Sequence, residues 1–201
     1  MMKRIFTLFS FLSFLLATAQ EIGTIQASKE FQDTLNKEYA NREESPLTAE
    51  DFKIFKTLDF YPVNEKFIIT AQFIRTEKEP VFKMKTSTDR LPEYVKYGEL
   101  HFEFNNKNFK LNVYQNIDLS KKAGFEDYLF LPFSDLTCGK ESYIGGRYMD
   151  LRFPKSDTVI IDFNTAYNPY CAYNHKYSCP IVPLENDLEI AIFAGVKKFH
   201  D

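Results

Sequence analysis

Apolar residues recur at helical spacing near the start of the chain and alternate with polar residues over most of the remainder. Between residues 27 and 39 an apolar side chain occupies every fourth position, which predicts an amphipathic helix with Ser28 as its N-cap. Thr48 and Asp51 resemble a capping box. We therefore expect a short second helix that runs through Phe55.

From residue 66 onwards, short runs rich in Phe, Ile, Val and Thr predict strands. The clearest hairpin spans residues 99–115, where apolar and polar positions alternate on both sides of an Asn-rich turn. Further strands are expected at residues 66–76, 80–87, 128–133, 147–153, 158–163 and 188–193. The pair 147–153 and 158–163 is expected to form a second hairpin.

Because strands follow one another without intervening helices, the predicted fold class is α+β. The sheet should be mostly antiparallel and strongly curved or barrel-like, with one or two N-terminal helices. No internal repeat or linker divides residues 20–201, so we expect a single globular domain.

Residues 1–19 have the pattern of a secretory signal peptide. Lys3 and Arg4 precede an apolar run over residues 5–16, and Ala17-Thr18-Ala19 offers a cleavage site. The run is too short to span a bilayer, so the expected product is periplasmic or secreted and not membrane-spanning.

Composition narrows the classes of partner. The formal net charge is −3, and a slightly acidic chain argues against nucleic acid, whose phosphates require a basic surface. The chain has 21 Phe, 12 Tyr and no Trp, so an aromatic core is expected. Motifs for a cofactor or a Ser-His-Asp triad are not recognised, so no cofactor is expected.

Residues 162–186 are the least regular part of the chain and hold two of the three cysteines. In an exported protein Cys171 and Cys179 would form a disulfide that closes a short loop, with Cys138 left over. A disulfide between Cys138 and either of the other two is also compatible with the sequence. The alternative is a zinc or Cu(I) site in which His175, four residues from each cysteine, is a third ligand.

Several segments together resemble the domain of unknown function 1684 family, over nearly all of the chain after residue 19. They are Ser45-Pro46-Leu47-Thr48, Phe60-Tyr61-Pro62, Tyr97-Gly98, Leu131-Pro132-Phe133-Ser134-Asp135, Gly145-Gly146-Arg147-Tyr148-Met149-Asp150, Asp162-Phe163-Asn164, Asn168-Pro169, Cys171-Ala172-Tyr173, Cys179-Pro180 and Glu185-Asn186. The resemblance implies a coherent domain without an assigned activity. It includes the two cysteines of the 171–179 loop but neither Cys138 nor His175.

Two groups of residues could carry chemistry. Glycines before Arg147 could let backbone N–H groups and the guanidinium hold an anion, although a tight turn and an ion pair with Asp150 or Asp162 would look the same. Four acids near loop or strand ends could serve as general acid and base if two converge in a cleft. These acids are Asp135, Glu141, Asp162 and Glu185.

Four tyrosines in the irregular segment could stack on a sugar or an apolar ligand, or could be buried and seal the loop onto the sheet. They are Tyr167, Tyr170, Tyr173 and Tyr177.

The leading hypothesis is an exported, non-enzymatic domain that binds a small polar ligand or glycan between residues 135–147 and 162–186. The candidate ligand-binding residues are Asp135, Arg147, Tyr148, Asp162, Asn164, Asn168, Tyr173, Glu185 and Asn186. A hydrolase that uses the acids beside Arg147 and a purely structural envelope protein are the alternatives.

Overall fold

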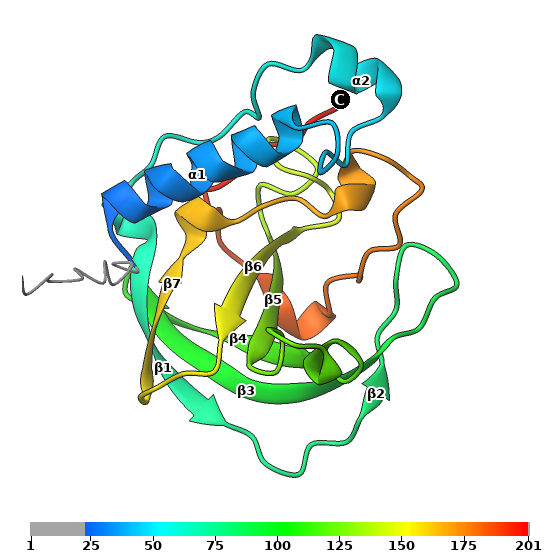
Figure 1. Ribbon diagram of the computed structural model, residues 1–201. Helices are drawn as coiled ribbons and strands as arrows, with labels where there is room; N and C mark the ends of the chain where they lie inside the picture. The colour runs from blue at the N-terminus through cyan, green and yellow to red at the C-terminus, as the bar shows by residue number, and fades with distance from the viewer. Residues whose placement is uncertain (1–22, 201) are drawn as a thin grey trace, which may run out of the picture.

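A computed structural model describes residues 23–200, so the predicted signal peptide lies outside the described residues. The helices are α1 (Ile25–Ala40) and α2 (Ala49–Ile54), and the strands are β1 (Ile68–Arg75), β2 (Phe82–Lys83), β3 (Glu93–Phe104), β4 (Lys107–Asn116), β5 (Tyr128–Asp135), β6 (Arg147–Arg152), β7 (Thr158–Asp162) and β8 (Asp187–Leu188). Short 3-10 helices are η1 (Glu65–Phe67), η2 (Leu119–Lys121), η3 (Phe163–Thr165), η4 (Tyr170–Ala172) and η5 (Leu184–Asn186). The sheet curls into a half-barrel, with α1 lying across one end (Figure 1). The α+β, mostly antiparallel prediction is therefore confirmed.

Both predicted helices form, but the cap of α1 differs from the prediction. Thr24 is the N-cap and accepts a hydrogen bond from Ala27 N at 3.1 Å. Ser28 lies inside the first turn, and its hydroxyl donates to Asp162 Oδ2 at 2.6 Å. Ser28 therefore ties α1 to the end of β7. The capping box of α2 is confirmed, since Thr48 Oγ1 accepts from Asp51 N at 3.1 Å.

The predicted β3–β4 hairpin is the longest pairing of the sheet, with Phe104 opposite Lys107. Asn105 and Asn106, which form the two-residue turn, have φ angles of +51° and +59°. Asn tolerates this left-handed conformation better than most residues, which is why the turn is short.

The predicted hairpin between residues 147–153 and 158–163 is wrong. β6 pairs with β5 and β7 pairs with β1, so the two strands lie at opposite edges of the order β6-β5-β4-β3-β1-β7. The link between them crosses from one edge to the other, because Phe153 N donates to Asp127 O before β5 and Phe73 N in β1 donates to Asp157 O. The curl of the sheet lets the short link at residues 154–157 join the two edge strands, and each edge strand pairs with a longer partner than its sequence neighbour, β6 with β5 and β7 with β1.

Two predicted strands are much shorter than expected. The 80–87 strand is reduced to β2, and the 188–193 strand is reduced to β8, which runs parallel to the end of β5. After Leu188 the chain leaves the sheet, and Leu136 N, directly after β5, donates to Ile190 O at 3.0 Å.

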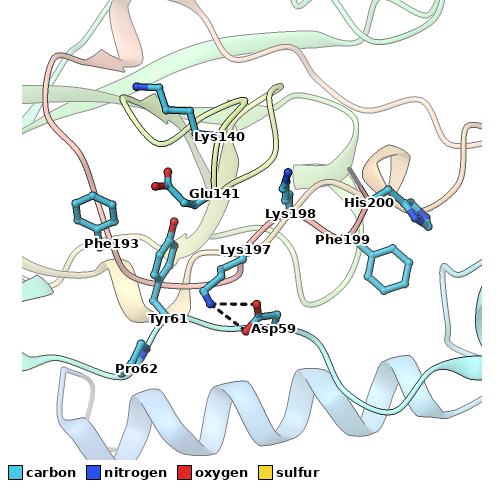
Figure 2. Close-up of a pocket in the computed structure, with 10 residues that line it drawn as sticks. All are labelled: Asp59, Tyr61, Pro62, Lys140, Glu141, Phe193, Lys197, Lys198, Phe199 and His200. Atoms are coloured by element: carbon cyan, nitrogen blue, oxygen red, sulfur yellow. Dashed lines mark hydrogen bonds and ion pairs between the residues drawn. The ribbon is translucent and has the colours of Figure 1, made fainter.

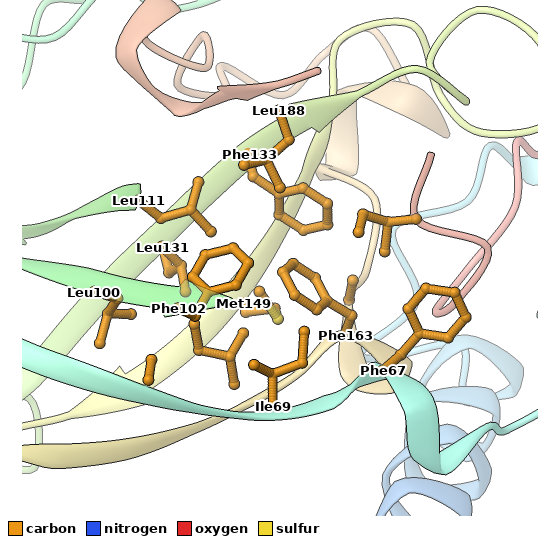
Figure 3. Close-up of a cluster of buried hydrophobic side chains, with 14 of the residues drawn as sticks. Phe67, Ile69, Leu100, Phe102, Leu111, Leu131, Phe133, Met149, Phe163 and Leu188 are labelled. Atoms are coloured by element: carbon orange, nitrogen blue, oxygen red, sulfur yellow. The ribbon is translucent and has the colours of Figure 1, made fainter. Parts of the chain in front are cut away.

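The main core fills the inside of the curl (Figure 3). Leu100, Leu111 and Leu131 are completely buried on neighbouring strands, and the rings of Phe133 and Phe163 meet edge to face with centroids 5.2 Å apart. Alternation of apolar positions along each strand places these side chains on one face. The expected aromatic core is therefore present.

A second apolar cluster joins α1 to the C-terminal segment, through Leu35, Tyr39, Tyr173 and Val196.

Between residues 23 and 200, neither helix is long and apolar enough to cross a bilayer.

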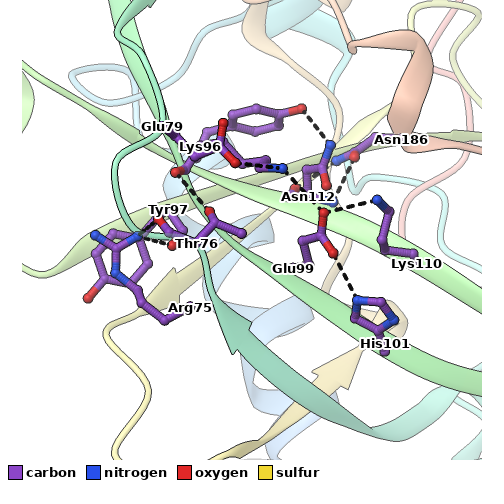
Figure 4. A network of polar contacts seen from close by, with 11 residues as sticks. Arg75, Thr76, Glu79, Lys96, Tyr97, Glu99, His101, Lys110, Asn112 and Asn186 are labelled. Carbon is purple, nitrogen blue, oxygen red and sulfur yellow. Dashed lines mark hydrogen bonds and ion pairs between the residues drawn. The ribbon is translucent and has the colours of Figure 1, made fainter.

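The outer face of β3 carries a charged network around Glu99 (Figure 4). Its carboxylate accepts from Lys110 Nζ at 3.0 Å and Lys96 Nζ at 3.2 Å, and it lies 2.9 Å from His101 Nε2. Burial alone would raise the pKa of Glu99, but these hydrogen bonds lower it to about 2.

Replacing Glu99 by Gln should remove one source of acid sensitivity. A carboxylate whose pKa is lower in the folded state stabilises the fold above its unfolded pKa near 4.5 and loses that contribution as the pH falls toward 2. Urea unfolding at pH 7 should show a loss of about 1 kcal/mol in the variant. The difference from wild type should shrink at pH 3 and vanish only below pH 2, once the folded-state carboxylate is protonated. A constant difference at every pH would contradict this explanation.

Candidate functional site

The guanidinium of Arg147 lies in the protein interior and is completely buried. It donates to the carboxylate of Asp135, to Ala194 O, and to Ile192 O at 2.9 Å. Asp135 Oδ1 in turn accepts from Thr137 N at 2.6 Å. The ion pair therefore forms with Asp135, and it fastens the C-terminal segment to the ends of β5 and β6.

The glycines before Arg147 form a tight turn. Gly146 N donates to Tyr143 O at 3.1 Å, and Gly146 has a φ angle of +83°. A Cβ atom at this position would lie 2.6 Å from Phe133 O, so the chain needs a glycine there for steric reasons as well. A tight turn is the structural alternative to the anion-binding loop that the glycines before Arg147 also suggest.

The buried asparagines of the predicted site bind backbone groups of distant segments. Asn164 Oδ1 accepts from Asn64 N, and its Nδ2 donates to Asn64 O, both at 3.0 Å. Asn168 Nδ2 donates to Lys197 O at 2.9 Å. Asn186 contacts both β4 and β5 through its amide. Each side chain thus connects two parts of the fold.

The remaining candidates are separated in space. Asp162 accepts from Ser28 on α1 and from Asn164 N at 3.0 Å, whereas the Tyr148 hydroxyl donates to Pro180 O. The Tyr173 ring packs edge to face on Tyr39, with centroids 4.9 Å apart.

Of the nine predicted ligand-binding residues, eight are buried and only Glu185 is exposed. None of the nine lines the pocket between residues 59–62 and the C-terminal segment. Their predicted contact with a ligand stays a prediction, while their hydrogen bonds give them a clear role in positioning the chain.

That pocket has a volume of about 550 Å³ and is formed by three segments (Figure 2). Backbone hydrogen bonds join the first segment to the last, from Tyr61 N to Gly195 O at 2.9 Å and from Lys197 N to Asp59 O at 2.8 Å. The third wall is attached by Lys198 N, which donates to Glu141 O at 2.9 Å. The lining residues are Asp59, Tyr61, Pro62, Lys140, Glu141, Phe193, Lys197, Lys198, Phe199 and His200.

The hydroxyl of Tyr61 is the most unusual group of this pocket. The side chain is only 8% exposed, and the hydroxyl has no hydrogen-bond partner among the described residues. The Thr137 hydroxyl donates to Asp135 and also lies close enough to Tyr61 to lower the pKa of the Tyr61 hydroxyl. Burial raises the pKa of Tyr61, Arg147 opposes this effect, and Glu141 adds to it. The hydroxyl is therefore protonated at neutral pH and has a hydrogen bond to donate.

The pocket combines aromatic and charged groups. The ring of Phe193 is 49% exposed and packs edge to face on Tyr61, with centroids 5.9 Å apart. In Figure 2 the Tyr61 hydroxyl points toward the Glu141 carboxylate, below Lys140. Lys197 Nζ is held 3.0 Å from Asp59 Oδ2. This set can stack on a ring and offer both donors and acceptors to polar substituents.

Sequence reasoning placed Glu141 among the candidate acids but missed the rest of this pocket. The available signal was the C-terminal run Lys197-Lys198-Phe199-His200, where two lysines precede two ring-bearing side chains outside any predicted strand. Its partner, residues 59–62, had no visible link to it because more than 130 residues separate the two in the chain.

The four candidate acids do not converge in one cleft. Asp135 and Glu141 both lie close enough to Tyr61 to raise its pKa, but Asp135 is paired with Arg147. Asp162 belongs to the α1 contact, and Glu185 is exposed beside Tyr114.

The four tyrosines divide between the two interpretations. Tyr173 is buried, and the Tyr167 hydroxyl donates to Asp150 Oδ1 at 2.6 Å. Tyr170 is exposed and its ring lies 5.2 Å from that of Tyr177.

All three cysteines are free thiols, so the predicted disulfide is not formed in this structure. Cys171 and Cys179 are nevertheless neighbours, since Cys171 N donates to Cys179 Sγ at 3.2 Å. The segment is irregular after η4, as Asn168-Pro169 and Cys179-Pro180 require, and His175 is exposed. Within residues 23–200 no group of three or more His, Cys, Asp and Glu side chains could hold a metal ion.

Comparison with solved structures gives a match to an uncharacterised protein of Haloarcula marismortui, whose structure was determined by solution NMR. The TM-score is 0.66 with 30% sequence identity, and the match covers 84% of this chain and 91% of the other. No match was found among curated proteins.

The family model described as "Protein of unknown function (DUF1684)" matches residues 53–197. The matched range includes β1 to β8, both cysteines of the 171–179 loop and the Asp135–Arg147 pair. The chain therefore belongs to the DUF1684 family of proteins of unknown function.

Proposed function

We propose that the protein is an exported domain that binds a small polar ligand, such as a sugar, in the pocket formed by residues 59–62, 140–141 and 193–200. The observation that carries this proposal is the buried hydroxyl of Tyr61, which lines the pocket and has no partner among the described residues. A buried donor without a partner costs about 1–3 kcal/mol, and a ligand oxygen would remove that cost.

The surrounding groups fit a sugar. Exposed aromatic rings such as Phe193 stack on the apolar face of a pyranose, while carboxylates and amines bind its hydroxyls. Glu141 can accept, and Lys140 can donate, on the same side of the pocket (Figure 2). The volume of about 550 Å³ suits one or two sugar rings.

In this proposal the buried residues Arg147 and Asp135 support the pocket wall and do not contact the ligand. Arg147 and Asp135 hold the C-terminal wall in place through Ile192 O and Ala194 O. The wall carries Phe193, so the ion pair positions the stacking surface without touching the ligand.

The proposal that the protein is exported depends on the signal-peptide pattern of residues 1–19. Cleavage after Ala19 would make Gln20 the N-terminal residue, and Cys171 and Cys179 would then meet oxidising conditions that favour a disulfide. Mass spectrometry of the protein recovered from culture supernatant and periplasm would test both statements. An intact Met1 on all of the protein would contradict export.

Replacing Tyr61 by Phe should weaken ligand binding about tenfold, because a hydrogen bond to a buried hydroxyl contributes roughly 1.4 kcal/mol. Backbone amide shifts in NMR spectra, titrated with N-acetylglucosamine, glucuronate and glucose 6-phosphate, would measure the affinity. Residues 59–62 and 193–200 should shift with at least one probe.

The matched control is Tyr39→Phe, because the Tyr39 hydroxyl is also buried without a partner but lies in the α1 cluster. Neither substitution should lower the free energy of unfolding, since each removes an unsatisfied polar group. Equal binding by wild type and Tyr61→Phe, or shifts confined to other surfaces, would contradict the proposed site.

A further inference from the structure

Cys171 and Cys179 lie together beneath an exposed loop, although neither has a role in the pocket. The Cys171 backbone nitrogen donates to Cys179 Sγ at 3.2 Å, and the two thiols are close enough to share a hydrogen bond. Two sulfurs this close can be joined by side-chain rotation, without rearrangement of the strands.

The surroundings hold both cysteines in place. Cys179 N donates to Ser87 Oγ at 3.1 Å, and Ser87 N donates to Cys179 O at 2.8 Å. Arg90 Nη2 donates to Ser178 O at 2.8 Å. The segment at residues 86–90 therefore fixes Cys179 from outside the loop, whether or not a disulfide is present.

The two thiols have different environments. The Tyr143 hydroxyl lies 3.9 Å from Cys171 Sγ, and Cys179 is the second hydrogen-bonding group at that sulfur. The hydrogen bond with Cys179 lowers the pKa of Cys171 to about 6, against the effect of burial. The same bond raises the pKa of Cys179. The Cys171 backbone N–H at Cys179 Sγ opposes the increase at Cys179, and Cys171 remains the thiol that loses its proton first.

Both cysteines are buried beneath an exposed loop. Cys171 and Cys179 are 7% and 8% exposed, and His175 and Lys176 between them are exposed. The covering loop makes few hydrogen bonds of its own, the main ones being within Tyr170–Tyr177.

We propose that Cys171 and Cys179 form a reversible thiol–disulfide exchange site, with Cys171 as the attacking thiolate and Cys179 as the resolving thiol. This role differs from a permanent structural staple, because the fold and the packing of both side chains are complete in the reduced state.

The reaction requires a small disulfide as the oxidant. The Cys171 thiolate attacks one sulfur of RS–SR, the S–S bond breaks, and RS⁻ leaves with the electron pair. Cys179 then loses its proton and attacks Cys171 Sγ, which breaks the mixed disulfide and releases the second RS⁻. In total the dithiol is oxidised by two electrons and two RSH are formed.

The test uses hydroxyethyl disulfide, acid quenching and intact-mass measurement of the native protein. Wild type should lose two hydrogens and carry no adduct, and dithiothreitol should reverse the change. Cys179→Ser should retain one mercaptoethanol adduct on Cys171, because the resolving thiol is absent. Cys171→Ser should react at least roughly tenfold more slowly than Cys179→Ser.

Cys138→Ser is the matched control and should behave as wild type, since Cys138 lies in the turn after β5, where its sulfur accepts from Asp135 N at 3.4 Å. An adduct on Cys138 in the wild-type protein, or equal adducts in the two single variants, would overturn the assignment. Reaction only after unfolding in urea would show that the pair is inert in the native protein.

A second measurement uses only the wild-type protein, so it tests the proposal even if a variant fails to fold. Wild-type protein is alkylated with iodoacetamide at pH 7 and its peptides are mapped. Cys171 should be modified before Cys179; the opposite order would overturn the roles given to the two thiols.

Discussion

Replacing Arg147 by Ala is expected to destabilise the protein by about 3–5 kcal/mol, because it leaves the buried Asp135 carboxylate without its cation. The substitution also removes the hydrogen bonds to Ile192 O and Ala194 O and opens a cavity where the side chain is completely buried. The melting temperature should fall by on the order of 10 °C. Urea unfolding followed by circular dichroism would measure the change.

Two control variants separate the effect of burying Arg147 from the effect of its charge. Arg152→Ala removes an exposed arginine paired with Asp127 at 2.7 Å, and should cost less than about 1 kcal/mol. The double variant Arg147→Met and Asp135→Asn removes both charges while an amide oxygen still accepts from Thr137 N, so it should recover part of the loss. A single Arg147→Ala variant as stable as Arg152→Ala would contradict the stabilising role given to the buried ion pair.

Replacing Asn186 by Ala is the second substitution with a large expected effect, about 3 kcal/mol or more. Asn186 Oδ1 accepts from Asn112 N at 2.8 Å, and Nδ2 donates to Asn112 O at 2.9 Å and to Pro132 O at 2.6 Å. Without the amide these three backbone groups become unpaired in the interior, at roughly 1–3 kcal/mol each.

The position of Asn186 explains why the amide is needed. β4 and β5 pair directly only at Tyr114 and Phe130. Pro132 has no N–H to donate, so the ladder cannot continue across it. The Asn186 side chain fills this gap and replaces the missing peptide group between the two strands. Figure 4 shows its contact with Asn112.

Asn174→Ala is the matched control, because Asn174 also accepts a backbone hydrogen bond, from Lys176 N at 3.2 Å, but in an exposed loop. Its free energy of unfolding should change by less than about 0.5 kcal/mol. Asn186→Asp should be at least as harmful as Ala, because it loses both donors and buries a charge. A mild effect of both Asn186 substitutions would mean that water replaces the amide.

Local patterns predicted the elements well because their causes are local. Apolar spacing identified α1, the Thr48 capping box identified α2, and alternation with an Asn-Asn turn identified β3 and β4. The predicted hairpin of β6 and β7 failed because strand pairing depends on how the sheet curls, which involves β1 and β5. A turn-like link of four residues looks the same in both arrangements.

The candidate site was predicted less well, for a related reason. Arg, Asp and Asn residues in irregular segments are equally suited to bind a ligand or to satisfy buried backbone groups. Here Arg147 and Asn186 do the second, whereas the residue that lines the pocket with a buried hydroxyl and no partner among the described residues is Tyr61, which was not a predicted site residue.

The sequence by itself determined the α+β class, the order of most elements, the aromatic core and the family resemblance, because periodicity and turn chemistry act between near neighbours. Only the tertiary structure decided which strands form the edges, that Arg147 is buried against Asp135, and that residues 59–62 meet residues 193–200 to form a pocket. These contacts join segments far apart in the chain, and their energies depend on burial and distance, which no local pattern contains.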